Sequence, residues 1–247
     1  MTVLIAGGDS FTYGAELQDC VGSYSNLTWS ALFAKRMGMS YCCTAKSGAA
    51  NSSIRRNVMN AVHKYKDTED LFVAVMWSFP NRYEFRFNYD TGHRDSPWYS
   101  FNPWIYKDTD IQEHFHVDDP DVLEYHIKHR KNAESRGISD FARSYVKNVA
   151  ESEYWELYTS WTDIVMLQNY LGEQDIPYRF LMVDNSLFEY NTSMDITLRT
   201  LRESIHWFAH DEGMYNWAKR TNQPFYTTHP QESAHEEWIN MLYDRIT

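Results

Sequence analysis

Cysteine is scarce in this chain. The 247 residues include three cysteines, Cys20 and the neighbours Cys42 and Cys43. Three thiols cannot all pair within one chain, and the adjacent two fall in a predicted strand. The scarcity excludes a small secreted domain held together by disulfides and predicts a protein that folds in a reducing compartment.

Positive charge is also in short supply. Lysine and arginine together number 23, against 34 aspartates and glutamates, so the formal net charge is −11 with histidine neutral. The basic residues form no long run along the sequence. Proteins that bind a phosphate backbone need clustered positive charge, and we therefore expect no nucleic-acid partner.

Long apolar runs and repeats are absent as well. No stretch approaches the roughly 18 apolar residues of a membrane-spanning helix, and no basic segment followed by an apolar one resembles an export signal. We therefore expect a soluble, cytoplasmic protein with no membrane partner. Because no repeat, low-complexity tract or shift in composition divides the chain, we expect one domain over residues 1–247.

Aromatic residues, in contrast, are abundant, with 18 Tyr, 13 Phe and 9 Trp. Many of them lie in residues 85–137, where no regular periodicity is visible, and we predict that this segment is an insertion or lid over the active edge. Its rings either stack on sugars or form a small satellite core. The segment also contains His114, His116, Asp118 and Asp119, but their spacing fixes no metal geometry. We expect a solvated loop there, and no metal or other cofactor.

Short apolar runs alternate with segments of helical periodicity along the rest of the chain. Residues 2–6, 39–44, 71–77 and 178–183 are predicted to be buried strands, and residues 224–226 a short fifth one. Helical spacing is found in residues 27–38, 51–62, 139–172 and 232–246. The pattern predicts the α/β class: a three-layer α/β/α sandwich with a central, mostly parallel sheet of about five strands.

Residues with chemical potential follow the predicted strands. Ser10 follows the first strand, Gly48 and Asn51 the second, and Ser78 the third, whereas His229 precedes the last helix. The carboxyl ends of parallel strands meet at one edge of a sheet, where open α/β folds hold their ligands. A serine hydroxyl there becomes a nucleophile only when a base takes its proton and donors stabilise the oxyanion.

The order of these blocks resembles that of the SGNH hydrolases, also called the GDSL-like lipase/acylhydrolase family. The likeness is carried by Gly8-Asp9-Ser10-Phe11, by Ser47-Gly48-Ala49-Ala50-Asn51 and by His229-Pro230, and it covers all of the chain, least of all residues 85–137. It implies a flavodoxin-like fold in which Ser10 is the nucleophile and His229 the general base. The backbone N–H groups of Ser10 and Gly48 would then be oxyanion donors.

Two positions depart from the family pattern. The family has an asparagine after the third strand as a further oxyanion donor, and here Ser78, Asn81 or Asn51 would have to replace it, although Asn51 could instead cap its helix. The family also has an aspartate three residues before the histidine, where this chain has Tyr226. A backbone carbonyl, Asp184 or no group at all would then orient the imidazole.

A further likeness is to a subgroup that is often encoded by tailed bacteriophages. It rests on Trp77-Ser78 with Arg82 and Glu84, and on Ala234-His235 and Trp238 after the final block. In this context Arg82 and Glu84 form a structural ion pair or touch the substrate, and Trp77 is a candidate substrate contact. We predict that His235 is a packed or hydrogen-bonded helix residue rather than a second base.

These observations predict a serine esterase that acts on a small-molecule or carbohydrate ester, for example an acetyl or other short acyl group on a sugar. Two alternatives stay open. The site could have lost catalysis and serve as a binding or structural module that recognises a glycan, or the same Ser10 and His229 could transfer the acyl group to an alcohol. Nucleotide binding is disfavoured, since Gly7-Gly8-Asp9-Ser10 lacks the spacing of the nucleotide-binding motifs.

Overall fold

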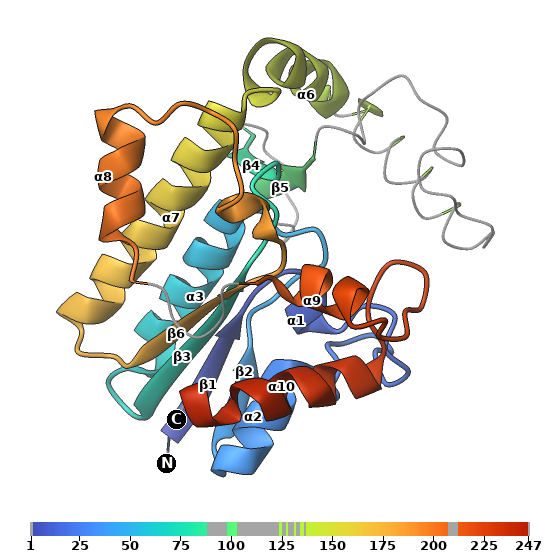
Figure 1. Ribbon diagram of the computed structural model, residues 1–247, viewed down its shortest axis with the longest axis vertical. Helices are drawn as coiled ribbons and strands as arrows, with labels where there is room; N and C mark the ends of the chain where they lie inside the picture. The colour runs from blue at the N-terminus through green and yellow to red at the C-terminus, as the bar shows by residue number, and fades with distance from the viewer. Residues whose placement is uncertain are drawn as a thin grey trace.

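The centre of the molecule is a parallel sheet of four strands. The computed structural model describes residues 2–87, 98–102, 124, 127, 131, 134–135, 137–206 and 212–246. Strands β1 (Thr2–Gly7), β2 (Ser40–Cys43), β3 (Asp70–Trp77) and β6 (Tyr178–Met182) lie in the order β2-β1-β3-β6 and are all parallel (Figure 1). Counted among these four strands, the order is 2-1-3-4, as in flavodoxin-like folds. The predicted α/β class is confirmed.

Strand β1 is central because it is paired on both sides. Ile5 lies opposite Cys42 of β2 and Val73 of β3. The side chains of β1 are buried from Val3 onwards. A continuous apolar run of this kind suits a parallel strand that is covered by helices on both faces. Because β1 has a neighbouring strand on each side, its end, and with it Ser10, lies within the carboxyl edge rather than at a corner of the sheet.

Two layers of helices enclose the sheet. One face is covered by α3 (Asn51–Tyr65) and α7 (Glu153–Glu173), with α8 (Ile196–Ser204) packed outside them. The other face is covered by α2 (Trp29–Met37), α9 (Met214–Arg220) and α10 (Glu232–Ile246) (Figure 1). Each layer has its own apolar core, centred on Trp161 and Phe180 in the first and on Trp29 and Trp238 in the second. The arrangement is the predicted three-layer sandwich.

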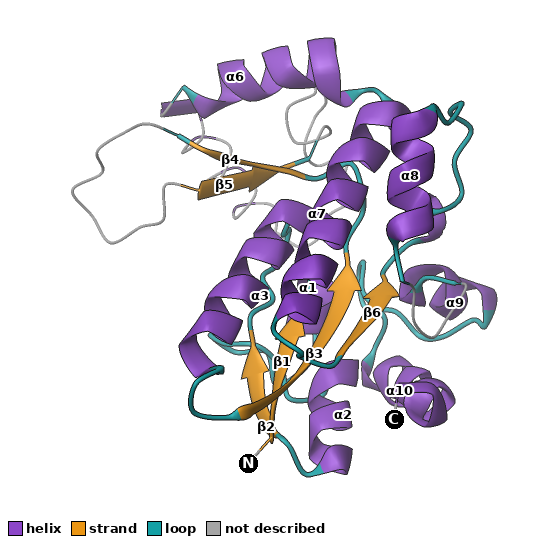
Figure 2. Ribbon diagram, turned by 90° about the vertical axis from the view of Figure 1, so that its left-hand side faces the viewer, coloured by secondary structure: helices purple, strands orange, loops and turns teal. Residues whose placement is uncertain are grey.

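A smaller unit lies beyond the carboxyl ends of the main strands (Figure 2). Strands β4 (Tyr83–Arg86) and β5 (Trp98–Phe101) pair antiparallel, next to α6 (Ile138–Tyr145) and the π-helical turn η2 (Val146–Ala150). Tyr83, Phe101 and Ile138 are buried in a satellite core of their own. Phe85, Phe87 and Tyr99 of the predicted insertion pack against this core, whereas Trp98 is exposed. Most of the insertion predicted over residues 85–137 lies outside the described residues. Residues 114–119, with their histidines and aspartates, lie outside the described residues.

Two sequence-based predictions of secondary structure were wrong. Residues 224–226 form no strand, because Phe225 and Pro230 make a single antiparallel bridge and proline has no N–H to extend a ladder. The sheet therefore has four described strands instead of about five. The predicted helix over residues 139–172 is interrupted after η2, where the Ser152 hydroxyl accepts a hydrogen bond from the Trp155 N–H and starts α7 as a new helix.

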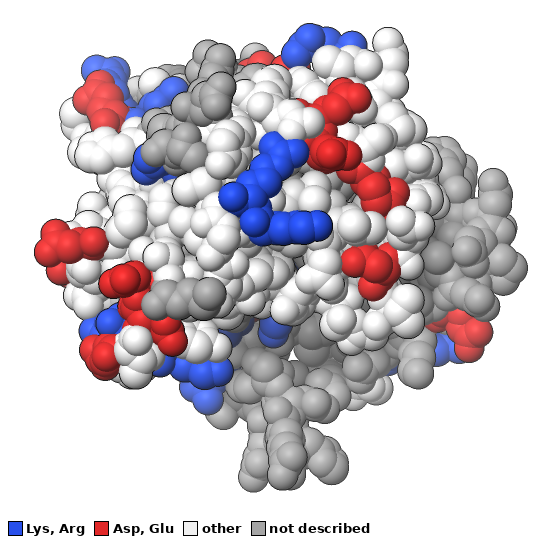
Figure 3. Space-filling view, turned by 90° about the horizontal axis from the view of Figure 1, so that it is seen from below, with Lys and Arg blue, Asp and Glu red and all other residues white. Residues whose placement is uncertain are grey.

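Three features of the described residues can be compared with the composition of the sequence: the distribution of surface charge, the hydropathy of the helices and the state of the cysteines. In the face shown in Figure 3, blue and red side chains occur in small groups, some of which contain both colours, and no continuous blue area spans the face. Among the described residues, no helix is long and apolar enough to cross a membrane. All three cysteines are free thiols.

Candidate active site

Ser10 is presented by a tight turn between β1 and the one-turn helix α1 (Ser10–Tyr13). A side chain at Gly8 would collide with the Thr12 hydroxyl, so the turn needs glycine there. Asp9 caps α1, since its Oδ1 accepts a hydrogen bond of 3.0 Å from the Phe11 N–H. The sequence of the motif thus explains why Ser10 emerges at the carboxyl edge of the central strand.

The structure brings the two predicted catalytic side chains together. The Ser10 Oγ and the His229 Nε2 are 2.7 Å apart, although the two residues are 219 positions apart in the sequence. This is the hydrogen-bonding distance expected between a serine nucleophile and its base. The Phe11 ring lies 5.0 Å from the imidazole, between ring centres, and the His229 side chain is 15% exposed. The imidazole is therefore packed on one side and still accessible.

The second imidazole nitrogen faces a residue that the sequence analysis did not identify. The Nδ1 of His229 is 3.2 Å from the Glu16 Oε1 and 2.9 Å from the Thr228 hydroxyl oxygen. Because a carboxylate only accepts hydrogen bonds, Nδ1 carries the proton in this arrangement, which leaves Nε2 to accept from Ser10. Asp184, the residue expected there, instead caps the short helix η3 (Asn185–Leu187) by accepting from the Ser186 N–H.

Glu16 also shapes the loop that carries the histidine. Its Oε2 accepts the N–H groups of Thr227 and Thr228 at 3.0 Å and that of His229 at 3.2 Å. Burial raises the pKa of Glu16, but the hydrogen bond and charge of His229 and the bonds from Thr228 outweigh burial and lower the pKa to about 2. Glu16 is therefore ionised at neutral pH. No sequence motif singles out this residue, which lies six positions after Ser10 in a turn.

Two backbone donors at the site remain available. The N–H groups of Ser10 and Gly48 donate to no acceptor within the described residues. Gly48 has a φ of 73°, and a Cβ there would meet only open space. The Lys46 N–H donates to the Gly8 carbonyl at 3.3 Å and ties this turn to the nucleophile turn. The arrangement leaves both amides free for an oxygen of a ligand, as an oxyanion hole requires.

Two of the three side chains expected to supply a third donor, those of Ser78 and Asn51, are already used. The Ser78 hydroxyl donates to the Asp9 Oδ2 at 2.7 Å. The Asn51 amide donates to the Ser78 carbonyl at 3.3 Å and to the Ser160 hydroxyl at 3.0 Å, and its Oδ1 accepts the Ser78 N–H at 2.8 Å. Asn51 makes no helix cap either, because Ala50 occupies the cap position of α3. Both Ser78 and Asn51 therefore hold the site together rather than face a substrate, and Asn81 has a buried, unpartnered Oδ1.

Arg82 and Glu84 do not pair with each other, contrary to one expectation. The Arg82 Nη1 contacts the Asp9 Oδ2 at 2.7 Å, whereas Glu84 pairs with the Arg56 Nη2 at 2.6 Å. Each carboxylate thus has its own arginine, from a different part of the fold.

Trp77 and His235 are both core residues. Trp77 is fully buried with its ring edge-on to Phe180, so it is no substrate contact in this structure. His235 is buried too, and its Nδ1 accepts the Trp29 N–H at 3.2 Å, in agreement with the predicted packing role.

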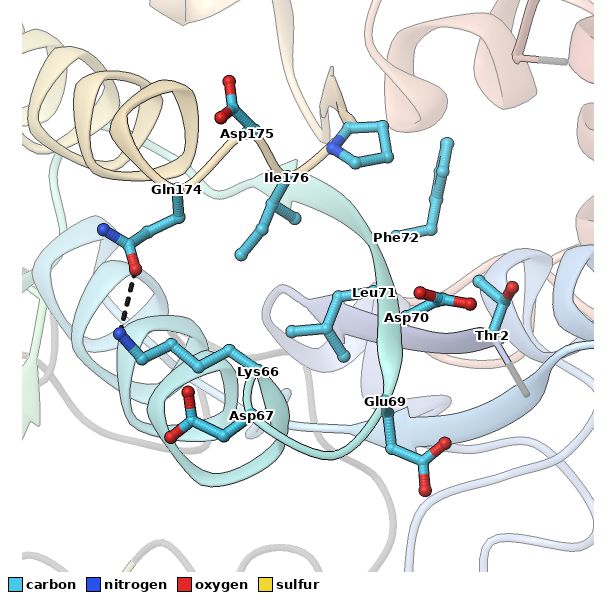
Figure 4. A pocket seen from close by; sticks show the side chains of 11 residues that line it. Thr2, Lys66, Asp67, Glu69, Asp70, Leu71, Phe72, Gln174, Asp175 and Ile176 are labelled. Atoms are coloured by element: carbon cyan, nitrogen blue, oxygen red, sulfur yellow. Dashed lines mark hydrogen bonds between the residues drawn. The ribbon is translucent and has the colours of Figure 1, made fainter.

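A cavity of about 550 Å³ lies at the opposite edge of the sheet (Figure 4). Thr2 and Asp70, which begin β1 and β3, line it together with Lys66 and Gln174. The Lys66 Nζ donates to the Gln174 Oε1 at 2.9 Å across its rim. Because Ser10 follows the other end of β1, this cavity is separate from the candidate active site. Within the described ranges, no group of three His, Cys, Asp or Glu residues could hold a metal ion.

Comparison with known proteins found similarity in structure only. No family model and no curated protein sequence matches the chain. The psychrotrophic esterase EstA from Pseudoalteromonas sp. aligns over 99% of this chain and 96% of its own, with 12% identity and a TM-score of 0.48.

Two further structures are more distant. A carbohydrate esterase, whose active site is described as having divergent catalytic and non-catalytic binding functions, aligns over 98% of this chain and 67% of its own, with 9% identity and a TM-score of 0.43. A lipolytic protein of the G-D-S-L family from Desulfitobacterium hafniense DCB-2 aligns over 83% and 97%, with 15% identity and a TM-score of 0.26. The strand order and the contact between Ser10 and His229 at the carboxyl edge lead to the conclusion that the chain has a flavodoxin-like α/β fold, as the resemblance in sequence implies.

Proposed function

We propose that this protein is a serine esterase that hydrolyses its substrate through an acyl-enzyme on Ser10. The observation that carries the proposal is the 2.7 Å contact between the Ser10 Oγ and the His229 Nε2. A serine paired with a base at this distance, beside two unpaired backbone N–H groups, has the parts that acyl transfer needs.

In the proposed reaction, Ser10 attacks the ester carbonyl while its proton passes to the His229 Nε2. The N–H groups of Ser10 and Gly48 bind the oxyanion that forms, and each such donor stabilises the transition state by about 3 kcal/mol. The imidazolium then gives the proton to the leaving alcohol as the C–O bond breaks. Water repeats the sequence on the acyl-enzyme and releases the acid, so that Ser10 and His229 return to their starting states.

Glu16 takes the part of the carboxylate in this scheme. Its contact with the Nδ1 side of His229 favours the tautomer in which Nε2 is free to accept a proton, and its charge stabilises the imidazolium. This removes one reason to regard the site as lapsed, because the missing aspartate at position 226 has a replacement from another loop. The binding-module alternative then rests on the engagement of Ser78 and Asn51, which leaves neither as a third side-chain donor.

We further propose that the substrate is a short acyl ester of an alcohol with an apolar ring face, such as a sugar. Support comes from a group of aromatic rings beside the base. The Tyr215 ring is edge-on to Phe11, Phe79 and Phe225, with ring centres 6.2, 6.4 and 5.9 Å apart, and Phe11 contacts His229. Tyr215, Phe79 and Phe225 are partly exposed, and such rings bind sugar faces well.

The experiment is intact-mass analysis after incubation with a fluorophosphonate probe. The natural chain is expected to gain one adduct, which Ser10→Ala abolishes and His229→Ala slows. Ser23→Ala and His63→Ala change an exposed serine and an exposed histidine elsewhere, and both should label like the natural chain. An adduct that persists in Ser10→Ala, or no adduct on the folded natural chain, contradicts the proposed mechanism.

Acyl transfer uses the same residues and is distinguished by its products. When an acetyl ester is turned over in the presence of a sugar as a second acceptor, acetate should be the main product if water is the acceptor. Acetylated sugar as the main product would assign the protein to the transferases instead.

A further inference from the structure

The turn that presents Ser10 rests on a buried ion pair. The Asp9 side chain is fully buried and the Arg82 side chain is 9% exposed, with 2.7 Å between the Asp9 Oδ2 and the Arg82 Nη1. The guanidinium also lies over the Phe79 ring, 4.8 Å from its centre. Burying a carboxylate or a guanidinium this deeply costs free energy of folding unless the group has a partner. Asp9 and Arg82 therefore each need the other.

Asp9 is where the ion pair meets the nucleophile. Its Oδ1 accepts the Phe11 N–H and so closes the turn around Ser10, whereas its Oδ2 accepts from both the Ser78 hydroxyl and Arg82. Arg82 in turn donates to the Ser78 oxygen at 2.9 Å. The side chains of Asp9, Ser78 and Arg82 thus form a triangle of short hydrogen bonds. The second Asp9 oxygen, Oδ1, holds the start of α1 through the Phe11 N–H.

The triangle is anchored on the far side by Asn51. The Asn51 side chain bonds both the N–H and the carbonyl of Ser78, and its amide also reaches the Ser160 hydroxyl on α7. A continuous chain of buried hydrogen bonds thus runs from α7 through α3 and the end of β3 to the nucleophile turn. Among the described side chains of this network, only the Arg82 Nε is buried without a partner. A buried network in which the other polar atoms are paired is rigid.

We propose that Arg82 is a positioning residue, which keeps the Asp9 carboxylate in place and thereby holds the Ser10 hydroxyl and N–H in their reactive geometry. The inference rests on the proposed esterase function. Without the guanidinium, the Asp9 carboxylate has no countercharge among the described residues, and the side chain must rotate toward water or lose its hold on the Phe11 N–H. A displacement of Ser10 by about 1 Å lowers the rate by about 100-fold.

The test compares Arg82→Met, Asp9→Asn and the double variant in the hydrolysis of 4-nitrophenyl acetate, a neutral ester. Arg82→Met is expected to lower kcat about 100-fold with little change in KM, because the ground-state contacts of a neutral ester do not involve the guanidinium. The double variant removes the unpaired charge together with its partner, and it should recover at least about tenfold over Arg82→Met. Arg56→Met is the matched control, since it breaks another arginine–carboxylate pair, with the buried Glu84, away from Ser10. It should keep kcat within about twofold.

Amide hydrogen exchange gives a second readout that does not depend on turnover. Arg82→Met should speed exchange of the Phe11 N–H, and Arg82→Lys, which keeps the charge, should lie between Arg82→Met and the natural chain. If the natural chain shows neither labelling nor hydrolysis, the proposed function fails, while the exchange measurement still tests the role of Arg82.

Two results would overturn the positioning role. One is an Arg82→Met protein that keeps both kcat and the protection of Phe11. The other is a double variant no more active than Arg82→Met, which would mean that the guanidinium acts on the substrate itself.

Discussion

Glu16 has two roles, one for each of its carboxylate oxygens. Oε1 faces the His229 Nδ1 and the Thr228 hydroxyl, whereas Oε2 takes the N–H groups of residues 227–229. The same side chain therefore orients the base and determines the conformation of the loop that carries it. Successive backbone N–H groups that converge on one oxygen form an anion-binding nest, and this nest is filled by the protein's own carboxylate.

The ionisation of Glu16 predicts a dependence of stability on pH. The folded-state pKa of about 2 lies below the ordinary value of 4.5, so its contribution to the free energy of unfolding is present above pH 4.5 and is lost as the pH falls towards 2. Glu16→Gln lacks this contribution. Urea unfolding should show the natural chain more stable than Glu16→Gln at neutral pH, with a difference that shrinks below pH 4.5. A difference that is constant with pH contradicts the assignment.

Glu16→Gln also predicts a loss of activity without loss of the fold. A glutamine can donate to the Nδ1 of His229 and so favour the wrong tautomer, which by analogy with serine hydrolases of other folds lowers kcat by about 10²- to 10⁴-fold. Glu212→Gln, which changes a partly buried carboxylate bonded to the exposed Arg220, is the control and should leave kcat unchanged. Equal kcat values for the two variants would exclude Glu16 from the mechanism.

The sequence could predict Ser10, Gly48 and His229 because each lies in a local motif next to a strand or helix signal. It could not predict Glu16, since the contacts of this residue join positions more than 200 residues apart and any acidic side chain in a turn has the same local appearance. The partners of Arg82 and Glu84 were missed for the same reason. Two charges of opposite sign two residues apart suggest an ion pair with each other. In the fold, Arg82 instead pairs with Asp9, and Glu84 pairs with Arg56.

At the scale of single elements, the first turn of α7 contains a carboxylate, that of Glu156, whose ionisation is disfavoured by its surroundings. Burial, and then the charge of Glu153, raise the pKa of Glu156 to about 7. Residues of this helix reach the site through Ser160, one turn further on, whose hydroxyl accepts from Asn51. Ionisation of Glu156 therefore opposes folding at the start of the helix that anchors the hydrogen-bond network.

Glu156→Gln is predicted to stabilise the protein at high pH. A folded-state pKa of about 7, above the ordinary 4.5, means that the natural chain loses stability as the pH rises from 4.5 through 7. The variant has no such loss, so its melting temperature should exceed that of the natural chain at pH 8 and match it near pH 4.5. Glu236→Gln, at an exposed position of α10, is the comparison and should not show this crossover.

Elements were predictable where apolar runs or periodicity were strong. The four strands of the sheet and the helices that cover them follow from such patterns. Burial on both faces demands continuous apolar residues, as the central strands β1 and β3 show. The break at Ser152 and the failed strand at residues 224–226 depend on a capping bond and on one bridge beside Pro230, which periodicity does not register. The β4–β5 pair was hidden because its aromatic residues pack on α6 rather than on the main sheet.

For the whole molecule, the net charge of −11 predicts how salt affects turnover. A negative protein repels an anionic ester at long range, and the repulsion is screened when the Debye length falls from about 30 Å at 0.01 M to about 10 Å at 0.1 M salt. The kcat/KM for a carboxylated ester should rise severalfold over this range. That for a neutral acetyl ester of similar size should stay the same, and an equal response of both esters would contradict the prediction.

The separation of 219 positions between Ser10 and His229 has a consequence for the protein while it is being made. At ribosomal rates of about 5 to 20 residues per second, Ser10 exists for on the order of 10 to 40 seconds before His229 is added to the chain. During that time the growing polypeptide has a serine and two amides but no base. Glu16 also lacks its partners until residues 227–229 are made. On the proposed mechanism, the nascent chain therefore cannot attack esters in its surroundings until synthesis has reached the histidine.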